Sequence, residues 1–477
     1  PPNQTENKPG VTQHHVNVLQ DGPRNLKGDG MNVGAWDEIA FQHLDFSPSG
    51  RLVNVNTGAT GQHGTHLSGT IAGRGLINPF ARGMAPNATL YSYNGYDGAA
   101  GGGHFDNNLI EMATEIPAKT LVASNHSYHD GLGVQCVLGG VATSYSLRAR
   151  NADLNLNNHT YHLHCHSAGN AQASCASGWV SITGTGKAAK NNIVVGALTS
   201  TDGMTSFSSF GPVNDGRVKP EICAFGNGVL STNNSTTTPY ASLSGTSMAT
   251  PGIAGTLTLV SQRYKQLNGN VLPSSALVKN VACNTAQDLG NPGPDYRFGF
   301  GRVNALKAIR IFEENRYALN TVAQAGQNDV TLTVPAGAAK LNVMLTWNDP
   351  AGAANSATPL VNNLDLTVSD GTTTTLPWVL NPNSPANNAT RAVDNISNIE
   401  QVTIDNPPAG NYVFRVTGTS IASGPTQSYA LTWNLEMPYI EVTFPNGNES
   451  FNPGSAEIIT WDNAGVTGNQ TVEYSTN

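Results

Sequence analysis

The sequence carries little charge for its length. Only 12% of its 477 residues are charged, and the net charge is −8. Nucleic acids bind to clustered basic side chains, so this balance argues against a nucleic-acid partner. No apolar run reaches the roughly 18 residues that a membrane-spanning helix needs. The chain also opens without a signal-peptide pattern. We therefore expect a soluble, secreted protein whose targeting segment has been removed.

Cysteine is also scarce. The sequence has five cysteines, an odd number, so at least one thiol is unpaired. Cys223 and Cys283 sit within apolar patterns and are predicted to be buried, inert thiols. One disulfide is expected among Cys136, Cys165 and Cys175 if the compartment is oxidising. The pair Cys136 and Cys175 is favoured because both lie in loop sequence rich in glycine and serine, but the other pairings stay open.

A serine lies at the centre of the small-residue run SGTSMATP, residues 244–251. The flanking Gly245 predicts a tight strand-to-helix connection, with the Ser247 Oγ free and its N–H at the helix N-terminus. Pro251 lacks an N–H and is expected in the first turn of that helix. The plain alternative is a loop leading into a core helix, so the motif needs partners.

Two upstream motifs supply such partners. Residues 61–73 place His63 between glycines at the start of a small-residue helix, and residues 31–37 form an apolar strand ending at Asp37. A serine hydroxyl attacks an amide only with the help of a nearby base whose pKa is near 7. That base in turn needs a group to fix its tautomer. Asp37, His63 and Ser247 can fill these roles.

The runs HGTHLSGTIAG and SGTSMATPGIAG resemble the His and Ser motifs of the subtilisin-like serine proteases. The chain order Asp, His, Ser is also that of subtilisin. The resemblance implies that Ser247 is the nucleophile, His63 the general base and then acid, and Asp37 the orienting carboxylate. His66 would be structural. The segment Asp37-Glu38-Ile39 departs from the family, in which Asp-Thr-Gly or Asp-Gly-Gly is usual.

The same resemblance implies an oxyanion donor. Asn170 matches the asparagine of the family's AGN turn and would donate to the oxyanion beside the Ser247 N–H.

It also implies two walls of a substrate-binding groove. Residues 125–129, NHSYH, resemble the strand that binds an extended peptide, which implies backbone binding at Ser127 and Tyr128. His129 stands where glycine is usual, so no side-chain preference is carried over. The second wall would be formed by Ser167, Ala168 and Gly169.

The length exceeds what one core usually supports, so two or three domains are expected. Residues 1–30 are polar and aperiodic, which predicts an N-terminal arm on the surface. In residues 31–317 short apolar runs alternate with helical patterns. This alternation predicts an α/β domain with a parallel sheet, helices on both faces and functional groups at the strands' carboxyl ends. The resemblance implies that it is a subtilisin-like catalytic domain. Three runs are predicted as buried strands: 90–93, 120–125 and 192–197.

Residues 318–438 show strands with period-two alternation, which predicts an antiparallel β-sandwich. The runs are 330–334, 341–347, 364–368, 412–416 and 429–433. Through the runs TWNDP (346–350), LVNNLDL (360–366) and DNISNIEQV (394–402), this segment resembles the jelly-roll domain that follows the catalytic domain in one branch of subtilisin-like alkaline proteases. Residues 439–477 look like the start of a further immunoglobulin-like module. They are too few to close a sandwich of about 100 residues, so the module is expected to be truncated.

Two groups of residues suggest metals. The candidate calcium ligands are Asp349, Asp365, Asp394 and Glu400 in the loops of the second domain. Ordinary Asx-type turns are the alternative for these residues. His162, His164 and His166 alternate on one strand face, as zinc ligands could. Histidines satisfied within the sheet are favoured over zinc there, because no fourth ligand is evident.

Two functions remain. The first is a secreted, monomeric serine endopeptidase that acts on protein or peptide substrates through an acyl-enzyme. It would have its own pro-segment as a transient inhibitor, structural calcium and no organic cofactor. The second is a catalytically silent extracellular binding or adhesion protein on a protease fold, since fold alone does not imply chemistry. The presence of all four catalytic residue types favours the peptidase.

Overall fold

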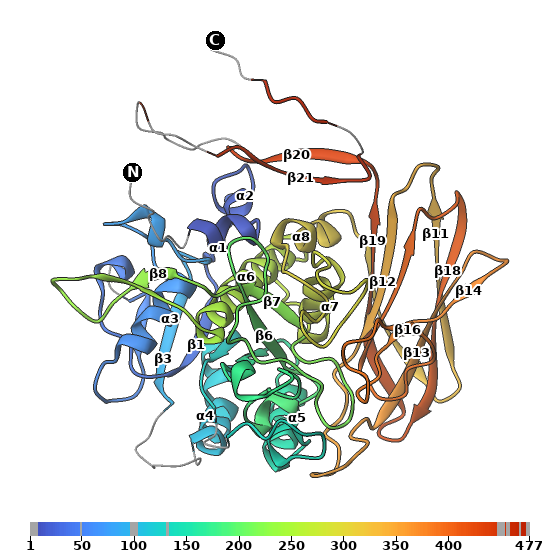
Figure 1. The fold of residues 1–477 in the computed structure, drawn as a ribbon, viewed down its shortest axis with the longest axis horizontal. Helices are drawn as coiled ribbons and strands as arrows, with labels where there is room; N and C mark the ends of the chain where they lie inside the picture. Colours follow the sequence, from blue (N-terminus) through green and yellow to red (C-terminus); the bar gives the residue numbers. More distant parts are fainter. Residues whose placement is uncertain are drawn as a thin grey trace.

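The computed structural model describes residues 8–47, 50–95, 104–129, 133–445, 454, 458–466 and 469–473. A seven-stranded sheet forms the centre of the larger domain, and all its neighbouring strands run parallel (Figure 1). In spatial order its strands are β2 (Leu52–Asn54), β3 (Thr89–Asn94), β1 (Asn32–Asp37), β4 (Leu121–His126), β5 (Leu163–Ser167), β6 (Ile193–Leu198) and β7 (Ile222–Phe225). The three predicted buried strands are β3, β4 and β6, so the predicted α/β class is confirmed.

Helices cover both faces of this sheet. Helices α3 (Gln62–Ala72) and α6 (Thr246–Leu267) pack side by side against β1 on one face. Helices α4 (His104–Lys119) and α5 (Leu147–Asn158) pack together on the other face. Side chains of β1 alternate between the two cores: Val33 and Ala35 join the α6 core, whereas Trp36 joins the α4 core. The alternation therefore directs Asp37 toward α3 and α6.

The N-terminal segment differs from the predicted surface arm. It forms helices α1 (Lys8–Gln13) and α2 (Asn17–Gln20), and its apolar side chains Val11, Val16 and Leu19 are buried in the core of the larger domain. The Nε2 of His14 accepts the N–H of Phe225 at 3.1 Å. The helices are too short for a periodic signal, which is why the sequence suggested an arm.

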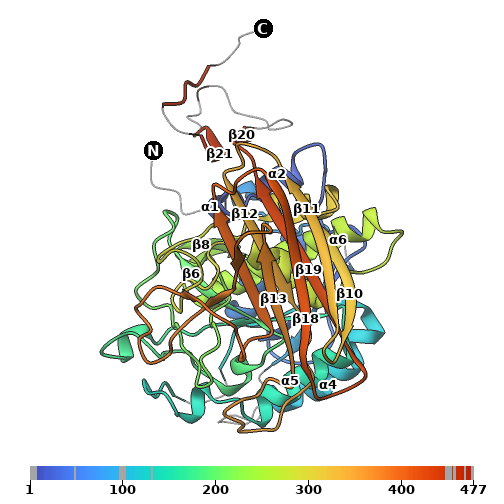
Figure 2. The same ribbon diagram turned by 90° about the vertical axis from the view of Figure 1, so that its right-hand side faces the viewer.

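The second domain is a sandwich of two four-stranded antiparallel sheets, as predicted (Figure 2). One sheet contains β10 (Tyr317–Ala323), β19 (Thr426–Glu436), β12 (Lys340–Thr346) and β17 (Ile399–Asp405). The other contains β11 (Gln327–Val334), β18 (Gly410–Ile421), β13 (Asn362–Ser369) and β14 (Thr374–Thr375). A small two-stranded sheet joins β15 (Trp378–Val379) to β16 (Thr390–Arg391).

The sandwich packs closely against the larger domain. Leu341, Val343 and Leu345 of β12 face the sandwich core, but Met344 belongs to the core of the larger domain. The contact is made by α7 (Ser275–Asn284), while α8 (Ala305–Glu313) packs beside α6 and α7. Asn280 of α7 donates from Nδ2 to the carbonyls of Met344 and Ala430, at 2.9 and 3.1 Å.

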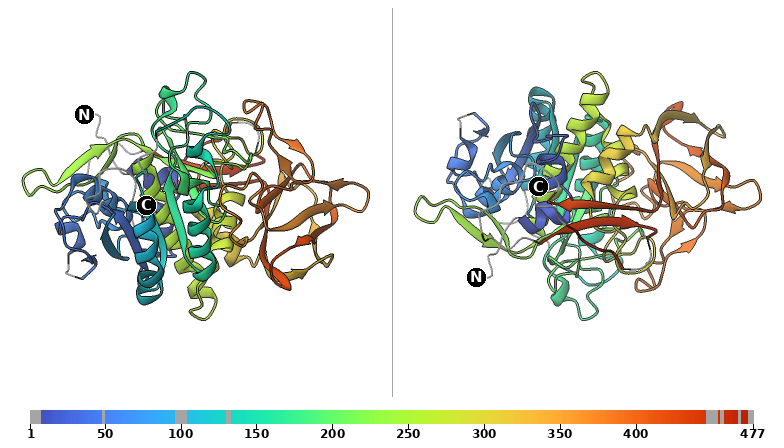
Figure 3. Two further views of the ribbon diagram at one scale, coloured as in Figure 1. Left: turned by 90° about the horizontal axis from the view of Figure 1, so that it is seen from below. Right: turned by 90° about the horizontal axis from the view of Figure 1, so that it is seen from above.

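A hairpin of β20 (Tyr439–Phe444) and β21 (Thr460–Ala464) follows the sandwich and lies beside the N-terminal helices (Figures 1 and 3). Asn17 donates to the Thr443 carbonyl at 2.6 Å, and Arg310 pairs with Glu441 at 2.7 Å. The strand-like run 440–444 lies in β20, whereas only residues 460 and 461 of the run 457–461 lie in β21. Residue 457 and residues 474–477 lie outside the described residues. Among the described helices, none has an apolar stretch long enough to cross a bilayer.

Candidate active site

The structure brings Asp37 and His63 together. Asp37 ends β1, and His63 is the second residue of α3. His63 Nδ1 lies 2.7 Å from Asp37 Oδ1, and the Asp37 side chain is only 1% exposed, against 31% for His63. A buried carboxylate bonded to Nδ1 fixes the ring and leaves Nε2 as the basic nitrogen.

Electrostatics favour His63 as a base. Burial lowers the pKa of the imidazole. The charge and hydrogen bond of Asp37, together with the charge of Glu38, outweigh this effect, so the pKa lies above its ordinary 6.5. Burial raises the pKa of Asp37, opposed by His63 and by the Glu38 N–H. A base of this kind becomes neutral, and so able to accept a proton, as the pH rises through its raised pKa.

Ser247 is the second residue of α6, which follows the hairpin of β8 (Val229–Thr232) and β9 (Tyr240–Leu243). Its Oγ donates to the Ser127 carbonyl at 3.1 Å, and no hydrogen bond to His63 is recorded between these described residues. Catalytic hydrogen bonds are often looser without substrate, and rotation about Cα–Cβ redirects the hydroxyl. His66 bonds through Nε2 to the carbonyls of Val229 and Ala241, in keeping with a structural role.

Pro251 does not lie in the first helical turn as the sequence suggested. Helix α6 begins at Thr246, so Pro251 lies within the second turn. A proline has no N–H for the carbonyl four residues earlier, which here is the carbonyl of Ser247. The Ser127 hydroxyl donates to that carbonyl at 3.0 Å instead.

Asn170 is held at the start of α6. Its Oδ1 accepts the N–H and the hydroxyl of Thr246, at 2.9 and 3.0 Å. With the oxygen fixed in this way, the Nδ2 group is left on the opposite side of the carboxamide as a donor. The Ser247 N–H is among the helical N–H groups that lack an intrahelical acceptor, and no acceptor for it is recorded among the described residues. A Cβ added to Gly245 would lie 3.4 Å from Asn170 Nδ2 and 3.5 Å from the Ser247 nitrogen, so both nitrogens border the same space at the start of α6.

The two predicted walls both contact the start of α6. Ser127 follows β4 and bonds to Ser247, while Gly169, beyond β5, donates its N–H to the Thr246 hydroxyl at 3.1 Å. Ser167 ends β5, and Ala168 is buried. The Tyr128 hydroxyl accepts from Asn108 of α4 at 2.8 Å, and its side chain is buried in the core beneath α4.

A disulfide joins the loops beyond these two walls. Cys136 and Cys175 are bonded, as the sequence favoured. Cys165, Cys223 and Cys283 are free and buried, which confirms the prediction for the last two. The disulfide links the chain after Ser127 to the chain after Asn170, so it constrains the spacing of the two walls.

Asp365, Asp394 and Glu400 lie near enough for their charges to interact, although the oxygens of the three carboxylates do not all lie within 4.8 Å of one another. Burial raises the pKa of Glu400 well above its ordinary value, and the charges of Asp394 and Asp365 add to the effect. Glu400 Oε1 and Asp365 Oδ1 are buried without a hydrogen-bond partner among the described residues. Asn363 Oδ1 is likewise buried without a hydrogen-bond partner among the described residues, and no sequence pattern had marked Asn363 as a ligand. Buried anionic oxygens with unused acceptor capacity fit a hard cation such as Ca²⁺.

Asp349 has a different role from the predicted one. Its carboxylate forms an ion pair with Lys190 of the catalytic domain, and both side chains are fully buried. It also accepts the N–H groups of Val361 and Asn362, at 2.9 and 2.7 Å. Lys190 donates further to the carbonyls of Pro350 and Pro359, both at 2.7 Å. These contacts satisfy both carboxylate oxygens of Asp349 and join the two domains. Asp349 is therefore a structural ion-pair residue and not a calcium ligand.

The histidine cluster is part of the buried sheet face. Possible ligand atoms of His126, His164 and His166 lie within 4.8 Å of one another. The rings are also hydrogen-bonded: His126 to Ser124 and Tyr128, His164 to Asn155, and His162 to Ser124 and the Leu121 carbonyl. Four aromatic side chains stand in register across neighbouring strands: Tyr93, Trp36, His126 and His166. The ring contacts of this stack, together with the hydrogen bonds above, explain how histidines can be buried on a sheet face that helices cover.

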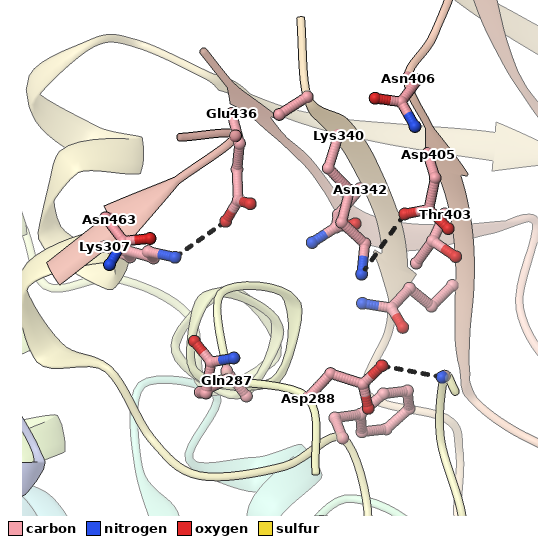
Figure 4. Close-up of a pocket in the computed structure, with 16 residues that line it drawn as sticks. Gln287, Asp288, Lys307, Lys340, Asn342, Thr403, Asp405, Asn406, Glu436 and Asn463 are labelled. Carbon is pink, nitrogen blue, oxygen red and sulfur yellow. Dashed lines mark hydrogen bonds and ion pairs between the residues drawn. The ribbon is translucent and has the colours of Figure 1, made fainter. Parts of the chain in front are cut away.

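A polar cavity of about 490 Å³ lies elsewhere, between the catalytic domain, the sandwich and the C-terminal hairpin (Figure 4). Figure 4 shows Lys307 facing Glu436 and Lys340 facing Asp405, at 2.9 and 3.9 Å. None of the predicted site residues lines it. Because Asp37, His63 and Ser247 all lie outside its lining, this cavity is separate from the candidate active site.

The fold and the site define an α/β protein in which a parallel sheet places the Asp37–His63 pair at the carboxyl end of β1, and Ser247 begins a helix packed against the His63 helix. The profile of the Subtilase family matches residues 35–301, more than half of the 477 residues. The chain belongs to the Subtilase family. The match ends before the β-sandwich begins.

Curated relatives agree with this assignment. Subtilisin DY of Bacillus licheniformis is 31% identical over 296 residues, covering 60% of this chain and 92% of the relative. An alkaline protease of Alkalihalobacillus alcalophilus is 33% identical over 294 residues, covering 60% of this chain and 66% of the relative. The serine protease/ABC transporter B family protein tagA of Dictyostelium discoideum is 28% identical over 263 residues, covering 47% of this chain but only 15% of the relative.

Proposed function

We propose that this protein is a secreted serine endopeptidase that hydrolyses peptide bonds of proteins through an acyl-enzyme. The observation that carries the proposal is the 2.7 Å contact of His63 Nδ1 with the buried Asp37 carboxylate, on helix α3 that packs against the helix bearing Ser247. The family membership and the protease names of the relatives support it. We expect a monomer that acts on protein substrates and is made with an inhibitory pro-segment.

In the proposed mechanism, His63 Nε2 takes the proton of Ser247 Oγ as that oxygen attacks the scissile carbonyl. Asp37 stabilises the imidazolium that forms. Asn170 Nδ2 and the Ser247 N–H bind the oxyanion of the tetrahedral intermediate. His63 then gives its proton to the leaving amine. A water molecule, deprotonated by His63 in the same way, hydrolyses the acyl-enzyme.

We also propose a structural calcium ion in the sandwich, held by Asp365, Asp394 and Glu400 together with the side-chain oxygen Oδ1 of Asn363. Calcium would neutralise carboxylates that burial otherwise disfavours in their charged form. The ion would act on stability and take no part in the chemistry.

Casein hydrolysis by three proteins tests the peptidase proposal: the wild type, Ser247→Ala, and Ser242→Ala as a matched control, since Ser242 is exposed on β9. We expect Ser247→Ala to lose at least about a thousandfold in rate and Ser242→Ala to keep the wild-type rate. An inactive wild type that binds extracellular proteins would favour the binding or adhesion function instead. Full activity in Ser247→Ala would assign the nucleophile to another residue.

A further inference from the structure

Glu38, the residue that departs from the family pattern, lies directly against the start of the His63 helix. Its Oε2 accepts the backbone N–H of His63 at 2.9 Å. The N–H groups of a first helical turn have no intrahelical acceptor, and the N-cap residue here is Gly61, which has no side chain to supply one. The carboxylate of Glu38, from the end of β1, therefore caps α3 from outside the helix.

Two glycines make this contact possible. A Cβ added to Gly61 would lie 1.8 Å from Glu38 Oε2, and a Cβ added to Gly64 would lie 1.8 Å from the Glu38 carbonyl oxygen. The N–H of Gly61 also donates to the Ile39 carbonyl at 3.0 Å. Residues 38 and 39 thus occupy space that only glycines on both sides of His63 leave open, so the β1 end and the first turn of α3 fit together as one unit.

Glu38 contacts both proposed members of the acid–base pair. Its backbone N–H donates to Asp37 Oδ1 at 2.8 Å, and the same oxygen bonds to His63 Nδ1 at 2.7 Å. Its side chain meanwhile holds the backbone of His63. Glu38 therefore fixes the Asp37 carboxylate and the His63 imidazole relative to each other. This matters because a displacement of a catalytic group by about 1 Å can lower the catalytic rate by about 10²-fold.

The charge of Glu38 acts in the same direction. A carboxylate at a helix N-terminus interacts favourably with the helix dipole, and it also stabilises an imidazolium nearby. The titratable groups that face His63 are Asp37 at the end of β1, Glu38 directly after it, and His66 from α3. Burial lowers the pKa of His66 to about 4, so His66 adds no charge at neutral pH.

We propose that Glu38 is a positioning residue: its carboxylate holds His63 in reach of Asp37 and places a second negative charge beside the imidazole. This inference rests on the proposed peptidase function. In this chain the Asp-Glu-Ile segment would thus hold His63 next to the aspartate. Relatives with Asp-Thr-Gly or Asp-Gly-Gly lack this glutamate and must hold the histidine by other contacts.

Two substitutions separate the contact from the charge. Glu38→Gln keeps an oxygen acceptor for the His63 N–H but removes the charge, whereas Glu38→Ala removes both. Asp329→Asn is the control, because Asp329 is an exposed carboxylate on β11 that pairs with Arg415 at 2.7 Å. Each variant is assayed for kcat and KM on a short peptide from pH 5 to pH 10. The pKa of His63 is measured by NMR in the inactive Ser247→Ala background.

We expect Glu38→Gln to lower kcat about 2–5-fold with KM nearly unchanged. We expect it to move the acidic limb of the pH profile, and the NMR pKa of His63, downward by about half a unit. Glu38→Ala should show the same downward shift and lose about 10–100-fold in kcat, part of which the Gln variant retains. Asp329→Asn should change none of these quantities.

The proposal is overturned if the pH profile and the NMR pKa of His63 are the same in Glu38→Gln and the wild type. It is equally overturned if Glu38→Ala lowers activity only in proportion to a loss of folded protein. A wild type without peptidase activity would refute the proposed function alone, because the NMR titration still measures the action of Glu38 on His63.

Discussion

Ser127 and Ser247 exchange two hydrogen bonds across the candidate active site. The Ser247 hydroxyl donates to the Ser127 carbonyl at 3.1 Å, and the Ser127 hydroxyl donates to the Ser247 carbonyl at 3.0 Å. The second bond replaces the helical donor that Pro251 lacks. The strand that would bind substrate is thereby fastened to the residue that would attack it.

This relationship predicts coupling between Ser127 and Pro251. Ser127→Ala leaves the Ser247 carbonyl without a donor, and we expect kcat to fall about tenfold and the free energy of unfolding to fall by about 1 kcal/mol. Pro251→Ala supplies a helical N–H to the same carbonyl, so it should restore part of both losses in the Ser127→Ala background. Kinetics and urea unfolding of the two single variants and the double variant test this. Strictly additive effects would contradict it.

Asn170→Ala should lower kcat about 10²–10³-fold with little change in KM, because Nδ2 acts on the oxyanion and not on the bound substrate. Thr246→Val removes one of the two donors that fix Asn170 Oδ1 and should cause a smaller loss of kcat. Steady-state kinetics on a short peptide measure both. A raised KM with unchanged kcat would make Asn170 a substrate-binding residue instead.

The ion pair of Lys190 and Asp349 predicts that the sandwich stabilises the catalytic domain. Lys190→Met leaves a buried carboxylate without its cation and should lower the free energy of unfolding by about 3–5 kcal/mol. Adding Asp349→Leu removes the stranded charge and should recover much of that loss. Short-peptide activity at 25 °C should change little. If Lys190→Met unfolds like the wild type, the pair does not join the domains.

Calcium removal should lower the melting temperature. An ion bound only to the folded state at a hundredfold excess over its Kd stabilises by about 2.7 kcal/mol. Glu400→Gln should abolish the difference between calcium and chelator, and in chelator it should melt higher than the wild type, since one of three close carboxylates is gone. Asp329→Asn should keep the full calcium effect. A wild-type melting temperature insensitive to chelator would refute the site.

The sequence predicted the parts of this molecule that short segments determine. Short apolar runs between helical patterns located the sheet strands, period-two alternation located the sandwich strands, and the runs around Asp37, His63 and Ser247 predicted the site. The sequence could not reveal that Lys190, 159 residues from Asp349, neutralises that carboxylate. Nor could it show that Glu38 caps α3 or that the Ser127 hydroxyl compensates for Pro251. These contacts depend on how distant segments pack, which no local pattern encodes.

Covalent labelling at Ser247 tests the central claim most directly. The wild type is treated with a fluorophosphonate, which reacts with activated serines, and the labelled peptide is mapped by mass spectrometry. Because His63 must take the proton of the attacking hydroxyl, we predict one label per molecule, on Ser247, and at least about a hundredfold slower labelling in His63→Ala. Labelling of Ser247 at the same rate in His63→Ala, or no labelling of Ser247 in the wild type, would contradict the account.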